Sequence, residues 1–370
     1  MTSDRLNRLH DAGVSIWLDT LSRELLDSGA FAELIARGVT GATSNPTIFA
    51  KAIAGSDLYD EQLAALAATG LTDLQALFFA IALDDIRRAA DLLRPAYDQS
   101  GGRDGFVSFE CTPDVADDAD ATIEQALGLW ARIARPNAMI KVPATDAGLP
   151  AIEALTARGV NVNVTLLFSV ERYGQVIDAY TAGLERRIEV GQPVGAIASV
   201  ASFFVSRIDA KADAVLAPDS PLRGRVAIAN AQRAFARHRD RFSDRRWRAL
   251  ADAGAHPQRP LWASTGTKDP AYSDVLYVEG LIAPGTINTM PEATLRAFSD
   301  HGATGAELSA DGGSAEETLR EASAAGVDLE AITRGLERDG VRAFCDSYQE
   351  LLSRIDAVLQ RVSVSRQRVP

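Results

Sequence analysis

The chain has 370 residues, of which 46% are hydrophobic and 24% charged, so it holds enough apolar material for a sizeable core. Its formal net charge of −12 argues against binding to nucleic acid or to an anionic membrane, because both require a basic surface. Two cysteines are too few for a disulfide framework, and no apolar run is long enough to predict a membrane span. The polar N-terminal segment lacks the apolar core of a signal peptide, so we expect a soluble cytoplasmic protein.

Short β-rich runs alternate with helical stretches along most of the chain, a pattern typical of parallel βα units. Helices are predicted at 149–159, which ends on a glycine, and at 169–191, which opens with a serine cap. Eight strands with intervening helices fit a (β/α)8 TIM barrel of about 250 residues with insertions, and a doubly wound open sheet is the competing fold. The predicted strands span 15–20, 39–45, 106–111, 138–144, 160–168, 196–204, 260–265 and 286–291.

We predict one domain, with a barrel core at about 12–302 and a helical extension at about 303–370. Residues 57–97 are long enough for two or three additional helices. In the extension, Ser314 and Glu317 have the spacing of a capping box. An apolar stripe at helical spacing follows, which we expect to pack on the barrel, with a partner interface as the alternative; monomer and homodimer both stay open. The stripe consists of Val341, Phe344, Tyr348, Leu351, Ile355 and Val358.

Polar residues gather where the predicted strands end. Side chains alternate across a strand, so Ile16 and Leu18 on the helix side leave Trp17 and Asp19 facing the lumen. Barrel active sites lie at the C-terminal strand ends, which makes this set a candidate site. By the same alternation the inward residues include Ser108, Glu110, Lys141, Asn161, Asn163 and Thr165, and Asn45, Ser202 and Ser264 come late in their strands.

Lys141 is one of only four lysines and lies in the hydrophobic run AMIKVPA, where a charged side chain is costly unless it is paired. One interpretation is a structural ion pair with Glu110 or Asp19. The other is a desolvated amine, because burial favours the neutral form, which attacks a carbonyl carbon to form a Schiff base. Such chemistry needs proton transfer, which the two carboxylates can supply.

Several other chemistries lack their motifs. The sequence has no phosphate-binding loop, no dinucleotide fingerprint, no HExxH and no GxSxG, and its four histidines lie outside the predicted strand ends. A metal site or a histidine-dependent triad is therefore not expected. The stretch 223–248 carries nine arginines against two aspartates, and we favour a solvated helix there over a nucleic-acid patch.

Ordered motifs over roughly residues 10–300 resemble the transaldolase family, and the long C-terminal extension resembles its bacterial subgroup. The motif KVPAT alone would also fit related small aldolases. The resemblance implies a class I aldolase barrel without metal or separable cofactor, acting on sugar phosphates in the non-oxidative pentose phosphate pathway. A dihydroxyacetone unit would pass from sedoheptulose 7-phosphate or fructose 6-phosphate to glyceraldehyde 3-phosphate or erythrose 4-phosphate. The motifs are WLDT (17–20), TSNPTIF (43–49), IKVPAT (140–145), NVTLLFS (163–169), SFFVSRID (202–209), WASTGTKDP (262–270) and NTMP (288–291).

Roles for individual residues follow from the same resemblance. Lys141 would form the Schiff base, and Asp19 would be the acid/base for cleavage. Glu110 would act through a water that Thr165 helps to hold. The residues expected to contact substrate are Asn45 and Asn163 on the dihydroxyacetone part, Ser202 in the pocket wall, and Arg207 on the phosphate.

The sequence departs from the family pattern after the seventh strand. Many members carry SFRN there, with a serine and an arginine on the phosphate, whereas this chain has Ser264 followed by TGTK. We predict that Lys268 replaces the arginine and binds phosphate as a point charge rather than as a fork. Two alternatives stay open. One is a related aldolase that releases free dihydroxyacetone, and the other is a non-catalytic protein, either a barrel that binds sugar phosphates or a scaffold that uses the C-terminal helix.

Overall fold

Eight parallel strands close into a barrel in strict sequence order, from β1 to β8. The computed structural model describes residues 3–367, with side chains for 4–361. The closed barrel confirms the predicted TIM fold and excludes the open sheet. All eight predicted strands are present with ends shifted by a few residues: β1 (Ser15–Leu18), β2 (Val39–Thr43), β3 (Val107–Glu110), β4 (Ala138–Pro143), β5 (Val162–Leu167), β6 (Ser199–Phe204), β7 (Arg259–Ala263) and β8 (Ile287–Met290).

Helices surround the barrel, and the two predicted between strands four and six are present. Ser169 caps the second of them by accepting a hydrogen bond from the backbone N–H of Arg172 at 3.0 Å. The insertion after β2 is helical as predicted. The helices are α1 (Ser3–Asp11), α2 (Arg23–Asp27), α3 (Ala30–Ala36), α4 (Pro46–Gly55), α5 (Asp60–Ala68), α6 (Leu74–Gln99), α7 (Ala119–Ile133), α8 (Gly148–Ala157), α9 (Val170–Glu189), α10 (Ser206–Ala212), α11 (Val226–Arg241), α12 (Arg245–Asp252), α13 (Leu276–Glu279), α14 (Glu292–His301), α15 (Ala315–Ala324) and α16 (Leu329–Gln367), with a short 3-10 turn at Pro113–Val115.

The predicted capping box at the start of α15 is wrong. Ser314 does precede the helix, but its hydroxyl makes no capping hydrogen bond. Its backbone lies at φ −84° and ψ 4°, whereas a capping serine takes the extended conformation that turns its oxygen toward the helix amides. The spacing of Ser314 and Glu317 therefore matches the motif without its geometry.

The N-terminal end of the barrel is closed by packed and hydrogen-bonded side chains. Trp17 fills the lumen and donates from Nε1 to Asp104 Oδ1 at 2.9 Å. Asp104 also accepts from the Ser15 hydroxyl, which in turn accepts from Arg259 Nη2 at 2.7 Å. These groups satisfy one another's hydrogen bonds in the interior of this end of the barrel.

Gly41 on β2 has no side chain, which leaves space for the Trp17 ring in the lumen. A Cβ atom at residue 41 would lie 2.4 Å from the indole ring. We expect Gly41→Ala to lower the free energy of unfolding by about 1–3 kcal/mol, because the packed lumen has no space for the methyl group. Urea unfolding measures this, with Gly55→Ala as control, since a Cβ there meets no atom within 4 Å. Equal urea midpoints for Gly41→Ala and the parent would contradict the packing argument.

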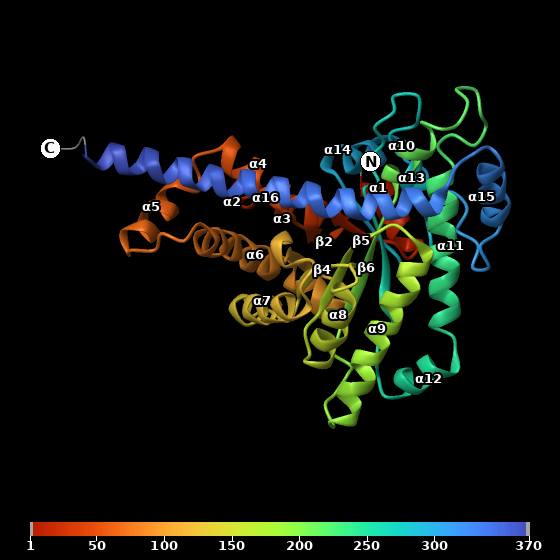
Figure 1. The fold of residues 1–370 in the computed structure, drawn as a ribbon, viewed down its shortest axis with the longest axis horizontal. Helices are drawn as coiled ribbons and strands as arrows, with labels where there is room; N and C mark the ends of the chain where they lie inside the picture. Colours follow the sequence, from red (N-terminus) through yellow and green to blue (C-terminus); the bar gives the residue numbers. More distant parts are fainter. Residues whose placement is uncertain (1–2, 368–370) are drawn as a thin grey trace.

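The long helix α16 runs over the C-terminal ends of the strands, where Figure 1 shows it lying across the barrel. Its apolar stripe packs on the barrel, as predicted, with Leu351 and Ile355 fully buried in the main core. Tyr348 meets Phe78 edge-on at 6.2 Å between ring centroids, and Thr47 Oγ1 on α4 donates to Ser347 Oγ at 2.7 Å. The extension is therefore fastened to the helix that follows β2.

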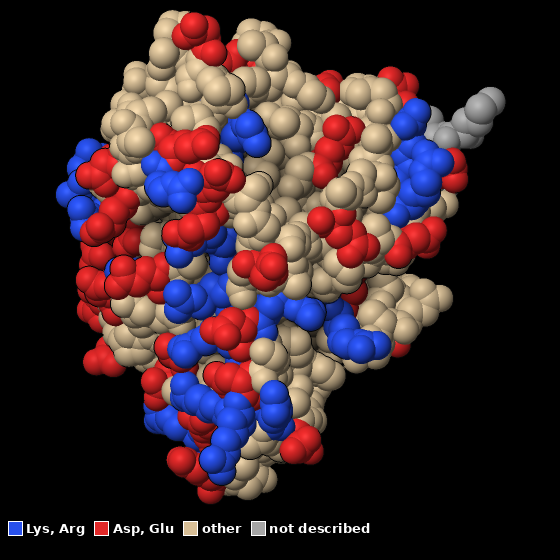
Figure 2. Space-filling view, turned by 90° about the vertical axis from the view of Figure 1, so that its right-hand side faces the viewer, with Lys and Arg blue, Asp and Glu red and all other residues tan. Residues whose placement is uncertain are grey.

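Basic and acidic residues alternate on the face that carries α11 and α12, as Figure 2 shows. Within the arginine-rich stretch, Arg241 pairs with Asp178 of α9, and Arg246 Nη2 lies 2.7 Å from Glu185 Oε2. These arginines have acidic partners on the neighbouring helix, as expected for a solvated helix face. Among the described residues, no helix combines the length and the apolar content that crossing a membrane requires.

Candidate active site

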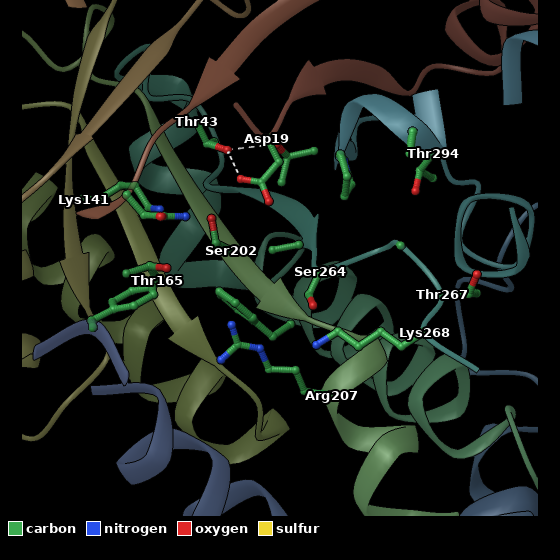
Figure 3. A pocket seen from close by; sticks show the side chains of 18 residues that line it. Asp19, Thr43, Lys141, Thr165, Ser202, Arg207, Ser264, Thr267, Lys268 and Thr294 are labelled. Carbon is green, nitrogen blue, oxygen red and sulfur yellow. Dashed lines mark hydrogen bonds between the residues drawn. The ribbon is translucent and has the colours of Figure 1, made fainter. Parts of the chain in front are cut away.

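A cavity of about 320 Å³ opens at the C-terminal ends of the strands. Figure 3 shows side chains from several strands converging on it. It brings together eight of the ten predicted site residues, whereas Glu110 and Asn163 do not border it. Its lining residues are Asp19, Thr43, Asn45, Lys141, Thr165, Ser202, Phe204, Arg207, Ala263, Ser264, Gly266, Thr267, Lys268, Thr289, Pro291, Ala293, Thr294 and Phe344.

Lys141 reaches the cavity from the middle of β4, as the strand alternation predicts. It is 5% exposed, whereas the three other lysines are exposed on the surface. Its Nζ donates to the backbone oxygen of Ser44 at 3.1 Å and lies 3.5 Å from Glu110 Oε2. The sequence left open a structural ion pair and a reactive amine; the structure shows that Lys141 is paired with Glu110 and also borders the cavity.

Asp19 faces Lys141 from the end of β1, and Thr43 fixes its carboxylate. Thr43 Oγ1 donates to Asp19 Oδ1 at 2.8 Å and lies 3.0 Å from Thr289 Oγ1 (Figure 3). Burial raises the pKa of Asp19, and Lys141, the Thr43 hydrogen bond and Arg207 act against this increase. Thr43 and Thr289 were not among the predicted site residues, although both lie in the family motifs and face the lumen by strand alternation.

Glu110 is the last residue of β3 and lies next to Lys141 of the neighbouring strand β4. Burial raises its pKa; the cation of Lys141 lowers it, and the carboxylate of Asp19 raises it further. Its Oε2 atom and Thr165 Oγ1 are both buried without a hydrogen-bond partner among the described residues. Two oxygens of this kind beside an amine are suited to hold a small polar molecule.

Asn163 is fully buried, and both ends of its amide are bonded to serines. Its Nδ2 donates to Ser108 Oγ at 2.9 Å, and its Oδ1 accepts from Ser202 Oγ at 2.7 Å. Asn163 therefore orients Ser202, which does border the cavity. Asn45 caps α4 by accepting from the N–H of Ile48 at 3.0 Å, and its amide borders the cavity.

Two cations converge on the outer part of the cavity. Figure 3 shows the Lys268 amine extending toward Arg207, with the Ser264 hydroxyl nearby, and the Arg207 guanidinium pointing further into the cavity. Neither cation forms an ion pair with any residue in the described part of the chain. Burial lowers the pKa of Arg207 while Asp19 opposes this, and the guanidinium stays charged above the Phe204 ring at 5.1 Å. This arrangement suits a bound anion.

Ser264 holds an unusual backbone conformation at the rim. Its φ of +57° places it in the left-handed region, which non-glycine residues rarely adopt. Its hydroxyl lies 3.0 Å from Ser206 Oγ, and its carbonyl accepts from the N–H of Ser206 at 3.1 Å. Such strain persists where the surroundings hold it, and it is frequent at binding sites.

Phe344 of α16 adds a wall from outside the barrel. The apolar stripe predicted the packing of this helix but not its place at the cavity. No local spacing links residue 344 to the strand ends, so only the tertiary fold reveals this contact.

The fold and site define a (β/α)8-barrel enzyme whose C-terminal strand ends hold a buried lysine between two carboxyl groups. The family model described as Transaldolase/Fructose-6-phosphate aldolase matches residues 16–355, and the chain belongs to this family. It is an enzyme of the transaldolase type, a transferase.

Curated relatives match over almost their whole length. A protein of Frankia alni named Transaldolase is 50% identical over 366 residues, which cover 97% of this chain and 98% of the relative. A Thermobifida fusca protein with the same name is 51% identical over 357 residues, covering 95% and 97%. A third, from Acidothermus cellulolyticus, is 47% identical over 372 residues, covering 99% and 100%.

Proposed function

We propose that the enzyme moves a dihydroxyacetone unit from sedoheptulose 7-phosphate or fructose 6-phosphate to glyceraldehyde 3-phosphate or erythrose 4-phosphate. The reaction would belong to the non-oxidative pentose phosphate pathway. The observation that carries this proposal is the buried amine of Lys141, which borders the cavity between Asp19 and Glu110. A Schiff base forms when such an amine attacks the ketose carbonyl and water leaves.

The positive iminium at Lys141 then draws electrons from the bond between the third and fourth sugar carbons. Asp19 takes the proton from the hydroxyl of the fourth carbon as that bond breaks, and the aldose departs. The three-carbon enamine stays bound to Lys141. An acceptor aldose enters, Asp19 returns the proton, and water hydrolyses the new Schiff base.

Glu110 and Thr165 support the proton transfers of Schiff-base formation in this mechanism. Glu110 Oε2 and Thr165 Oγ1 lack hydrogen-bond partners among the described residues, and Oε2 lies 3.5 Å from Lys141 Nζ. These oxygens suit a bound water that carries protons between the carbinolamine and Glu110. Glu110 does not border the cavity, so it acts through that water rather than on the sugar directly. Its raised pKa suits a group that both gives and takes a proton.

The substrate extends from Lys141 to the two cations. Asn45 and Ser202 contact the dihydroxyacetone part, and Asn163 acts by orienting Ser202. Arg207, Lys268 and Ser264 bind the phosphate at the far end, with Lys268 in the place of the family's arginine. We also propose that the barrel and the C-terminal helix act as one unit in the cytoplasm.

Product analysis separates transfer from release of free dihydroxyacetone. With fructose 6-phosphate as donor, we expect turnover to require an acceptor aldose, because the enamine stays on Lys141 until one arrives. Coupled assays for free dihydroxyacetone and for the new ketose phosphate measure this, with and without erythrose 4-phosphate. Release of dihydroxyacetone at the full rate without acceptor would support the aldolase alternative, and binding without turnover would support a non-catalytic barrel.

A further inference from the structure

The two cations of the cavity rim stand on separate elements. Arg207 belongs to α10, and Lys268 lies in the loop 264–275, which joins β7 to α13. No helix or strand forms within this loop, so the position of Lys268 depends on the contacts that hold the loop. Like charges repel, so without a bound anion the charges of Arg207 and Lys268 oppose the close approach of these two elements.

A tyrosine of the loop is bonded to the C-terminal end of α10. Tyr272 donates its hydroxyl to Asp213 Oδ2 at 2.6 Å, and Asp213 caps the helix that carries Arg207. The Tyr272 ring lies on Gly224, where a Cβ would be 3.0 Å from the ring. Arg223, next to Gly224, donates to the Asp213 backbone oxygen at 2.7 Å and lies 3.6 Å from Asp269 Oδ2 in the loop.

A second aspartate–tyrosine pair holds the other end of the segment. Asp209, one helical turn before Asp213, accepts from the hydroxyl of Tyr277 in α13 at 3.0 Å. It also accepts from the N–H of Ala227 at 2.8 Å, and both Asp209 and Tyr277 are buried. The Ser206–Ser264 contact closes the base of the same loop. The segment between β7 and α13 is thus tied to α10 at its start, its middle and its end.

We propose that Tyr272, through Asp213, is a positioning residue that holds Lys268 opposite Arg207 and thereby sets the preference for phosphorylated over unphosphorylated sugars. This inference rests on the proposed function, because it assigns the two cations to the substrate phosphate. The hydrogen bond between Tyr272 and Asp213 orders the loop before the substrate binds, and it opposes the repulsion between the cations. The phosphate therefore enters a site that is already formed. Tyr272 itself does not border the cavity.

The variant Tyr272→Phe removes only the hydroxyl that Asp213 accepts. We expect its KM for fructose 6-phosphate to rise about tenfold with kcat within about twofold, because the lost hydrogen bond to a charged group affects ground-state positioning. The KM for unphosphorylated fructose stays unchanged. Calorimetry with inorganic phosphate is expected to show a similar loss of affinity, independently of turnover.

Three further variants test the assignment. Tyr180→Phe removes another tyrosine hydroxyl, which donates to the His256 backbone oxygen at 2.8 Å, and is expected to leave both KM values unchanged. Asp213→Asn keeps an oxygen that accepts from Tyr272 and is expected to bind phosphate within about threefold of the parent, whereas Asp213→Ala should match Tyr272→Phe.

An equal loss for fructose and fructose 6-phosphate, or unchanged phosphate affinity in Tyr272→Phe, would overturn the inference. Failure of the proposed function has a different signature. In that case the parent enzyme forms no borohydride-trapped adduct on Lys141, whatever happens at residue 272. A Tyr272→Phe variant that traps fructose normally yet loses phosphate affinity supports the inference.

Discussion

Replacing Lys141 with alanine is expected to abolish transfer, lowering kcat by more than about 10⁴-fold, because it removes the buried amine that forms the covalent intermediate in the proposed mechanism. The three remaining lysines are exposed, and of these only Lys268 borders the cavity, on the loop beside Arg207. The measurement is the initial rate of transfer from fructose 6-phosphate to erythrose 4-phosphate.

Borohydride trapping identifies the amine directly. Reduction in the presence of fructose 6-phosphate is expected to attach the sugar fragment to the peptide that contains Lys141, and peptide mass mapping locates it. Lys211→Ala is the matched control, since Lys211 is an exposed lysine 3.8 Å from Asp339 Oδ2. An adduct on a different lysine, or none at all, would disprove the proposed chemistry.

Replacing Asp19 with asparagine is expected to lower kcat by about 10²–10⁴-fold, the usual contribution of a positioned acid or base. Asparagine keeps the volume and can still accept the hydrogen bond from Thr43, but it cannot take the hydroxyl proton as the carbon–carbon bond breaks. Schiff-base formation does not require this proton, so borohydride should still trap the donor on Lys141. Loss of trapping in Asp19→Asn would instead assign Asp19 to carbinolamine chemistry.

The pH dependence of kcat/KM is expected to report the ionisation of the Asp19 carboxyl group. Cleavage needs the ionised form, so kcat/KM is expected to rise with pH as Asp19 loses its proton. Burial raises its pKa, which places this acid limb above the range of an ordinary aspartate at about 4. Thr43→Val removes a hydrogen bond that lowers the pKa, so its acid limb should lie at higher pH than that of the parent. A limb that stays in place or moves to lower pH would contradict the assignment.

Strand alternation accounts for most of what the sequence reveals about the site. It turns Trp17, Asp19 and Lys141 to the same side because neighbouring residues of a strand face opposite sides, and the barrel confirms these directions. The closed topology was predictable because strands and helices alternate without interruption. The individual strand ends differ from the predicted ones by a few residues, because the last residues of a strand pass gradually into loops.

Other features depend on contacts that no local pattern encodes. Phe344 reaches the cavity only because α16 crosses the barrel. Asn163 does not border the cavity, and its amide is bonded to Ser108 of β3 and Ser202 of β6. The tie between Tyr272 and Asp213 joins residues far apart in sequence. Ser314 shows the reverse case, since a correct spacing fails where the backbone conformation does not suit the motif.

The crossing of α16 has a consequence for how the enzyme matures during synthesis. Phe344 is translated about two hundred residues after Lys141, and more than fifty after the last strand. At about 5–20 residues per second, several seconds pass between the synthesis of the last strand and the synthesis of Phe344. Until then the cavity that Lys141 borders lacks the wall that Phe344 supplies, and the final helix completes it.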